Sequence, residues 1–567
     1  MSSRNVDGRS ASEQIVPGTP NSNYDLFLKK QPAGGKDVAK TFPDRQIDNN
    51  INAIALPNEM WLKIFANLSY GDLLQVHLVC KHWRQLSRAE LKRKGKLVIT
   101  SQNLEDICIL VEYENLKYEN VEIRDEIDDK LVEFSNAQHA LLLRVFNYLG
   151  KDIVRVKLFK LSTLFLLNNL LPKLRDMDLS SLRYDRGVWV NLNKFSNLKS
   201  LLMPYNKLSA CQLSWTIVAS NQLSLAHLEK LDIGVSDSVA YSLDVIVMCA
   251  SSLHWLKLRL GTHAYLALKS KLIETFQKLT RLKVLDIGCT AMEAKRTILE
   301  NIPKESRLRA IMLGSDGVDD DLLELIGRKW STSLKCLHLK SNKITRNTVK
   351  QLNFLNGNLR SLQLSWNCPP PRDLLPSIVP KVNKTLTEIE LFGTYLCGDS
   401  FCAVAERLPN LKKLGLNFSF LAWRMIVDYN LHLKRMCEEM CSVFQHLTRL
   451  RHLAVILPCD QNNINYLCSQ PNISNLKRLK TLKSCLFPIK TLQILNLKFT
   501  FKELIKLQLN SCQKNEKLSG LELVDISKYF PALEELRIVN FDCDHNAIQG
   551  ARNSFPRLRR LQIVKIN

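Results

Sequence analysis

A six-residue phrase, L-x-x-L-x-L, recurs from about residue 150 to the last residues of the 567-residue chain. Ile, Val or Met sometimes replaces Leu, and successive copies start mostly about 24 to 30 residues apart. One strand-plus-helix unit of this length cannot bury its leucines alone, so neighbouring units must stack to enclose a shared core. The phrase therefore predicts an elongated α/β solenoid over residues 151–567.

The copies are regular enough to predict about sixteen leucine-rich repeats in a horseshoe. Fainter copies start at Ile153, Leu174 and Leu476. The clear copies start at Leu198, Leu228, Leu253, Leu282, Leu308, Leu334, Leu359, Leu386, Leu411, Leu450, Leu504, Leu533 and Leu558.

One interval is much longer than the others. Between Leu411 and Leu450 the chain carries about a dozen extra residues with a helical pattern. A lengthened helix on the convex side is the first interpretation. The alternative is an element that closes over a ligand through Trp423, Arg424 and Tyr429.

The chain before the repeats divides into three parts. Residues 1–50 are rich in Ser, Asn, Asp, Gly, Pro and Lys and lack apolar periodicity, which predicts a disordered tail. Residues 51–96 contain three short amphipathic helical patterns. Residues 97–150 hold more acidic than basic residues, and we expect a connecting segment or N-terminal cap with the first irregular repeats.

The helical patterns of residues 51–96 resemble the F-box motif. The chain reads Leu56-Pro57-x-Glu59, then Ile64-Phe65-x-x-Leu68, then Asp72-Leu73, and ends with Val79-Cys80-Lys81-x-Trp83-Arg84-x-Leu86. Joined to the repeats, this segment resembles the F-box/leucine-rich-repeat class of ubiquitin-ligase receptors.

The resemblance implies a substrate-recognition subunit of an SCF-type ubiquitin ligase, without catalytic residues or a cofactor of its own. The F-box would dock a Skp-family adaptor and through it a cullin–RING ligase. The repeats would hold a protein substrate near the charged conjugating enzyme, so that catalysis comes from tethering.

The residues support docking in one respect. A segment of forty residues cannot bury this many apolar side chains alone, so a patch should stay exposed unless a partner covers it. The alternative is that these apolar residues form a helical core of their own that packs against the first repeats. The adaptor-binding candidates are Leu56, Pro57, Glu59, Ile64, Phe65, Leu68, Leu73, Val79, Cys80 and Trp83.

The repeats offer a second surface. The apolar positions of the phrase should face the core, and the intervening positions should line the concave sheet, where many residues are basic. A solvated face is the plain interpretation, and an acidic or phosphorylated substrate is the functional one. The substrate-binding candidates are Trp255, Lys257, Lys335, His338, Arg360, Lys412, Arg451 and His452.

Two other function classes remain as alternatives. A non-degradative scaffold would keep the F-box for adaptor binding and use the repeats to organise an assembly. The net charge of +24 raises the second alternative, a protein that associates with nucleic acid. The basic residues follow the repeat without interleaved aromatic residues, so nucleic acid is not the partner that we expect.

Several kinds of chemistry have no motif in the chain. We find no phosphate loop, dinucleotide fingerprint, HExxH or nucleophile elbow, which indicates that the chain is not an enzyme. The sixteen cysteines contain no CxxC pair, and no long apolar run or apolar leader is evident. We therefore expect reduced thiols, no metal, no membrane span, and a cytoplasmic or nuclear location.

Overall fold

The computed structural model separates the chain into two units, residues 1–57 and residues 58–567. The predicted tail and the insert between Leu411 and Leu450 lie largely outside the described residues. The structure describes residues 56–68, 72–73, 76, 79–114, 118–124, 126–127, 130–131, 134–167, 169–182, 192, 195–204, 223–235, 241–261, 264–289, 291–314, 318–340, 357–365, 379, 381–392, 404, 406–417, 444, 446–456, 476–484, 500–510, 516–543 and 545–564.

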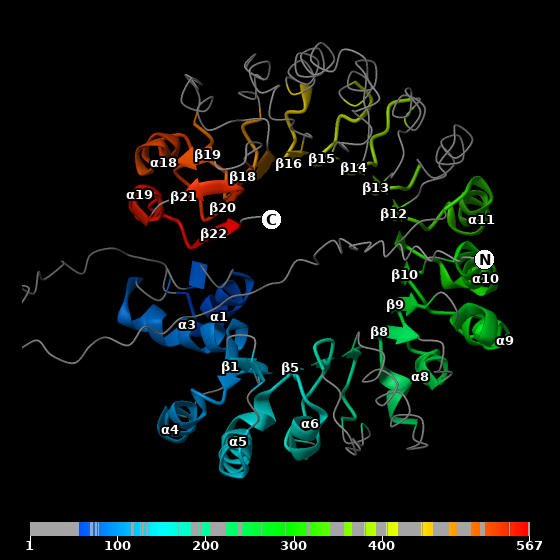
Figure 1. Cartoon of the computed structure of the whole chain (residues 1–567), viewed down its shortest axis with the longest axis horizontal. Helices are drawn as coiled ribbons and strands as arrows, with labels where there is room; N and C mark the ends of the chain where they lie inside the picture. Colours follow the sequence, from blue (N-terminus) through cyan, green and yellow to red (C-terminus); the bar gives the residue numbers. More distant parts are fainter. Residues whose placement is uncertain are drawn as a thin grey trace, which may run out of the picture. The chain divides into compact units, whose positions relative to one another are not determined.

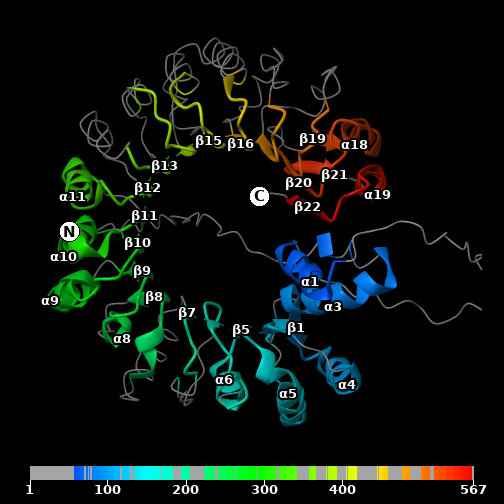
Figure 2. The same ribbon diagram turned by 180° about the vertical axis from the view of Figure 1, so that it is seen from behind.

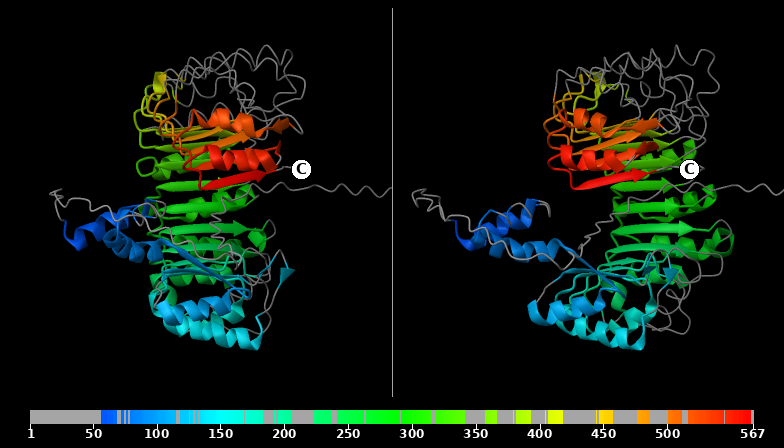
Figure 3. Two further views of the ribbon diagram at one scale, coloured as in Figure 1. Left: turned by 90° about the vertical axis from the view of Figure 1, so that its left-hand side faces the viewer. Right: turned by 60° about the vertical axis from the view of Figure 1, so that its left-hand side comes forward.

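Among the described residues of the second unit, eighteen strands form one parallel sheet. Its strands lie along the inner side of the array, and the helices lie along the outer side (Figures 1 and 2). The side views show the same strands stacked one above another (Figure 3). In pairing order the strands are β1 (Lys96–Thr100), β2 (Asn120–Arg124), β5 (Arg155–Lys157), β6 (Asp176–Asp178), β7 (Ser200–Leu202), β8 (Lys230–Val235), β9 (Trp255–Leu260), β10 (Val284–Gly288), β11 (Ala310–Gly314), β12 (Cys336–Lys340), β13 (Ser361–Ser365), β14 (Glu388–Phe392), β15 (Lys413–Asn417), β16 (His452–Ile456), β17 (Thr481–Ser484), β18 (Lys506–Asn510), β20 (Glu535–Val539) and β22 (Arg560–Val564).

Two short pairs of strands stand apart from this sheet. They are the antiparallel pair β3 (Glu126–Ile127) and β4 (Lys130–Leu131), and the parallel pair β19 (Glu516–Leu518) and β21 (Phe541–Cys543). The helices are α1 (Asn58–Asn67), α3 (Lys81–Lys94), α4 (Leu104–Glu114), α5 (Asn136–Leu149), α6 (Leu161–Leu167), α8 (Tyr241–Cys249), α9 (Ala264–Gln277), α10 (Met292–Asn301), α11 (Asp320–Trp330), α18 (Gly520–Ser527) and α19 (His545–Ser554), with short 3-10 turns at Gly150–Asp152, Leu223–His227 and Lys304–Ser306.

The apolar positions of the repeated phrase form continuous buried rows, as the sequence predicts. Leu256, Leu285, Ile311 and Leu337 are register partners in consecutive strands, and each is fully buried. The strand residues between them are only half-buried. The predicted leucine-rich-repeat fold is therefore confirmed, and β1 and β2 extend its sheet to residues before 151.

The expected register is wrong in one repeat. The sequence starts a repeat at Leu476, but in the sheet Leu482 pairs with Leu453 and Leu507, which makes Leu479 the first apolar position. Three leucines spaced three apart allow both alignments, and the polar Ser484 in the last slot hides the correct one. Lys477 and Arg478, which were expected on the concave face, lie in the turn before β17.

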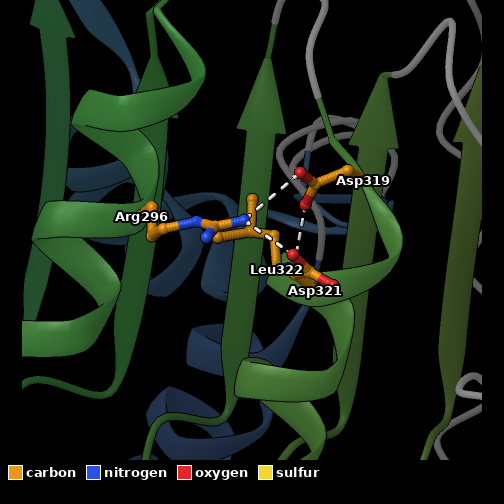
Figure 4. A network of polar contacts seen from close by, with 4 residues as sticks. All are labelled: Arg296, Asp319, Asp321 and Leu322. Carbon is orange, nitrogen blue, oxygen red and sulfur yellow. Dashed lines mark hydrogen bonds and ion pairs between the residues drawn. The ribbon is translucent and has the colours of Figure 1, made fainter.

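Polar contacts on the convex side join neighbouring repeats. Asp319 is the N-cap of α11, and its carboxylate accepts a hydrogen bond of 2.9 Å from the backbone N–H of Leu322. Arg296 of α10 reaches across to Asp319 at 3.3 Å and to Asp321 at 3.2 Å (Figure 4). One cap thereby stabilises a helix start and holds it to the preceding helix.

Within the described ranges, none of the helices combines the length and apolar character needed to cross a bilayer. The same residues contain no group of three or more His, Cys, Asp or Glu side chains placed to hold a metal ion. Cys249 is fully buried in α8, and burial raises the pKa of its thiol to about 12.

Candidate functional site

Helices α1 and α3 pack through an aromatic cluster. The ring of Trp83 lies 4.6 Å from that of Trp61 and 5.7 Å from that of Phe65, centroid to centroid. Phe65 is 1% exposed and Leu73 is 0% exposed. The sequence counted Phe65, Leu73 and Trp83 among the adaptor contacts. Phe65 and Leu73 are instead buried within the chain, and the half-buried Trp83 packs against Phe65.

The opposite face of α1 is apolar and exposed. Met60 and Ile64 lie one helical turn apart on the same side of α1 and are 44% and 40% exposed. Leu62 is 36% exposed on another side of the helix. Val79 is 63% exposed. We call Met60 and Ile64 the apolar patch.

The other adaptor-binding candidates differ in how exposed they are. Leu56 and Leu68 are half-buried, and Pro57 is exposed directly before the first residue of α1. Glu59 is exposed in the first turn, where the helix dipole favours an acid. Cys80 is exposed at the N-cap of α3, and its sulfur accepts a hydrogen bond of 3.4 Å from the backbone N–H of Trp83.

The sequence could not separate the inward side of α1 from the outward side. Met60, Ile64 and Leu68 repeat every four residues and suggest a buried stripe, whereas the buried ring belongs to Phe65. Met60, Trp61 and Leu62 were not among the predicted site residues. The run Met60-Trp61-Leu62 would have indicated them, because three adjacent apolar residues in a helix cannot all face one side.

Half of the predicted substrate-binding residues lie on the concave face within strands. The ammonium group of Lys230 lies 4.6 Å from the ring centroid of Trp255, a cation–π contact between adjacent strands. Lys257 forms an ion pair with Asp286 of the next strand at 3.4 Å. Asp286 offsets the charge of Lys257, so the face is less positive than its cations alone suggest.

Two histidines of this face are largely shielded from water. His338 lies within hydrogen-bond reach of the Ser361 hydroxyl at 3.5 Å, and burial is the main cause that lowers the pKa of His338. Burial also lowers the pKa of His452, with a further contribution from the positive charge of Lys413. Both imidazoles therefore favour the neutral form in the folded chain.

The other four predicted substrate-binding residues occupy a different place. Lys335, Arg360, Lys412 and Arg451 each stand immediately before a strand, at the edge of the sheet where the strands begin. The sequence assigned them to the concave face with the strand residues. The difference arises because the second position of the L-x-x-L-x-L phrase lies one residue before the strand begins.

Sequence and structure comparisons identify the N-terminal module. Residues 53–94 match the family model described as F-box-like. No curated protein matches the chain. A solved TLR13–ssRNA13 complex is similar to this chain at 15% sequence identity and a TM-score of 0.35, over 83% of this chain and 70% of that one. The assignment of the repeats rests on their own register.

Proposed function

From the premise that this protein is an F-box-like domain joined to a leucine-rich-repeat solenoid, we propose that it is a substrate-recognition subunit of an SCF-type ubiquitin ligase. The F-box docks a Skp-family adaptor, and the solenoid binds the protein to be ubiquitinated. The chain contributes no catalytic group. It raises the local concentration of a substrate lysine near the conjugating enzyme.

The apolar patch carries this proposal. Met60 and Ile64 leave apolar area in contact with water within the span that matches the F-box-like model, and Leu62 and Val79 are exposed within the same span. Burial of such area contributes about 25 cal/mol per Å², so a complementary apolar surface on a partner would be favoured. The aromatic cluster of Trp61, Phe65 and Trp83 supports the helix that presents the patch.

The test introduces charge into the patch without touching the cluster. In the full chain, Met60→Glu combined with Ile64→Glu should weaken binding of a purified Skp-family adaptor by about thirtyfold or more, as expected for central interface residues. Leu266→Glu combined with Val382→Glu is the matched control, because both side chains are exposed outside the F-box. The control should bind the adaptor like the parent chain.

A second pair of variants tests the motif residues. Leu56→Ala combined with Pro57→Ala should lose the adaptor and the cullin in affinity purification while the substrate is retained. Adaptor recovery equal to that of the parent chain would show that the docking assignment is wrong.

The ligase role is separable from a scaffold role in cells. A degradative receptor predicts that its captured protein survives longer when this chain is removed. If the adaptor binds but removal of this chain leaves the lifetime of every captured protein unchanged, the protein is a scaffold and not a ligase subunit.

A further inference from the structure

One position of the repeat is basic in consecutive repeats along the middle of the solenoid. It is the residue immediately before each strand, at the edge of the sheet where the strands begin. Lys283, Arg309, Lys335, Arg360, Lys412 and Arg451 occupy it before β10, β11, β12, β13, β15 and β16, and Lys480 extends the series before β17. Thr387 takes the place before β14. We call these seven cations the basic ladder.

The backbone holds the ladder in register. The N–H of Arg309 donates to the carbonyl oxygen of Lys283 at 2.7 Å, and the N–H of Lys335 donates to that of Arg309 at 2.8 Å. The same bond joins Arg360 to Lys335 at 2.7 Å and Arg451 to Lys412 at 2.8 Å. Successive cations are therefore attached to the backbone at the spacing of adjacent strands, about 4.8 Å, except that Thr387 separates Arg360 from Lys412 by twice this spacing.

The carboxylates near this edge do not pair with the ladder, and Glu229, at the same position before β8, acts on Lys283 only through its charge. Among the described residues, no carboxylate lies within ion-pair distance of a ladder side chain. The concave cations differ, because Lys257 pairs with Asp286 and Lys413 pairs with Glu390. In the described turns that lead into β10 to β17 the carboxylates are Glu305 and Glu406, beside further cations such as Arg281 and Arg449.

The arrangement has an energetic consequence. Like charges on neighbouring strands repel each other, so the stack costs stability when it is empty. A ligand with several negative groups would remove this repulsion and gain charge-assisted hydrogen bonds. Most of the ladder is open to such a ligand, because Lys283, Arg309, Arg360, Lys412 and Arg451 are exposed.

We propose that the basic ladder binds an extended, acidic segment of the protein substrate. The inference rests on the proposed function for the identity of its ligand as a substrate. From Lys283 to Lys480 the ladder spans seven strand spacings, about 34 Å, which an extended peptide covers with about ten residues. Glutamate, aspartate and phosphorylated side chains share the required chemistry.

The composition of the edge favours a peptide over a nucleic acid. Proteins that bind single-stranded nucleic acids combine a basic groove with aromatic side chains that stack on the bases. The described turns that contain the ladder hold no Phe, Tyr or Trp. A peptide needs only the charged groups and the regular spacing.

The test uses the full chain and labelled probes of defined chemistry. The probes are a glutamate-rich peptide of about twelve residues, a matched peptide with glutamine for glutamate, a phosphoserine peptide, and a single-stranded RNA of similar charge. Fluorescence anisotropy at low salt should show binding of the acidic peptides, no binding of the glutamine peptide, and weaker affinity as salt increases.

The variant Arg360→Glu/Lys412→Glu/Arg451→Glu should bind the acidic peptides about tenfold more weakly or worse. The control Lys151→Glu/Lys269→Glu/Arg328→Glu makes the same change in net charge at exposed positions outside the ladder and should bind like the parent chain. Equal weakening by both triple variants would overturn the ladder, because only net charge would matter. Tighter binding of the RNA than of either acidic peptide would also overturn the proposal.

The adaptor distinguishes a failure here from a failure of the proposed function. The ladder variant should bind a Skp-family adaptor normally, and the variant with Met60→Glu and Ile64→Glu should bind the acidic peptide normally. If the parent chain binds the adaptor but not the acidic peptides, only the proposed role of the basic ladder is refuted. Peptide binding without adaptor binding would refute the receptor role and leave the ladder intact.

Discussion

At the scale of single residues, the concave face is defined by pairs that join different repeats. Lys257 and Asp286 are 29 positions apart in sequence and 3.4 Å apart in space, and Arg259 lies 3.8 Å from Asp232. The sequence predicted the cations on this face but not their partners. A carboxylate in one strand becomes the neighbour of a lysine in another only when the register between the repeats is known.

His338 gives this face a dependence on pH. Burial lowers the pKa of His338, so the folded chain favours the neutral ring. When the pH falls below about 6.5, the unfolded chain takes up the proton first, and the free energy of unfolding decreases until the folded form is protonated as well. The stability contributed by the neutral ring is thus present near pH 7.5 and is lost toward acid.

The variant His338→Gln should remove part of this dependence. The loss of stability between about pH 7.5 and about pH 5.5, measured by urea unfolding, should be smaller in the variant than in the parent chain. His82→Gln, at an exposed position of α3, is the control. An identical pH profile for parent and variant would show that His338 titrates alike in both states.

At the scale of elements, the repeats could be predicted because burial imposes one apolar pattern on every strand. The prediction failed at β17, where Leu476, Leu479 and Leu482 fit two alignments. It also left out which side of α1 is buried, because that depends on the rings of Trp61 and Trp83 from two helices. The contacts between neighbouring helices follow no repeated sequence pattern, so they could not be predicted and are seen only in the structure.

The ion pairs of Arg296 in α10 with Asp319 and Asp321 at the start of α11 are such contacts. Replacing Asp319 by Ala removes the N-cap of α11 together with the pairing to Arg296, and should lower the free energy of unfolding by about 1 to 2 kcal/mol. Asp319→Asn keeps an oxygen acceptor for Leu322 and removes the charge. It should cost less than the alanine variant in urea unfolding, and an equal cost would assign the effect to the ion pair.

At the scale of the whole molecule, stability is shared along the stack. Each repeat contacts its neighbours, so a defect in the middle weakens the coupling between the two flanking parts. Leu337 is fully buried between β11 and β13. Leu337→Ala should cost about 2 to 5 kcal/mol through lost contacts and the cavity left behind.

The shape of the unfolding curve should change as well. Denaturant unfolding of Leu337→Ala should become broader than that of the parent chain, because the two parts of the array no longer unfold together. Leu266→Ala, at a position that is 79% exposed, should leave both midpoint and slope unchanged. A single transition with the parent slope would show that cooperativity does not pass through this repeat.

The strands β15 and β16 pair residue for residue, Lys413 with His452 and Leu416 with Val455, although their repeat starts are 39 positions apart. Pairing therefore constrains where a strand begins but places little demand on how much polypeptide separates it from the next. New material such as a fluorescent reporter could be spliced between these strands while the sheet keeps its order. A repeat array built this way can gain accessory parts without rebuilding its frame.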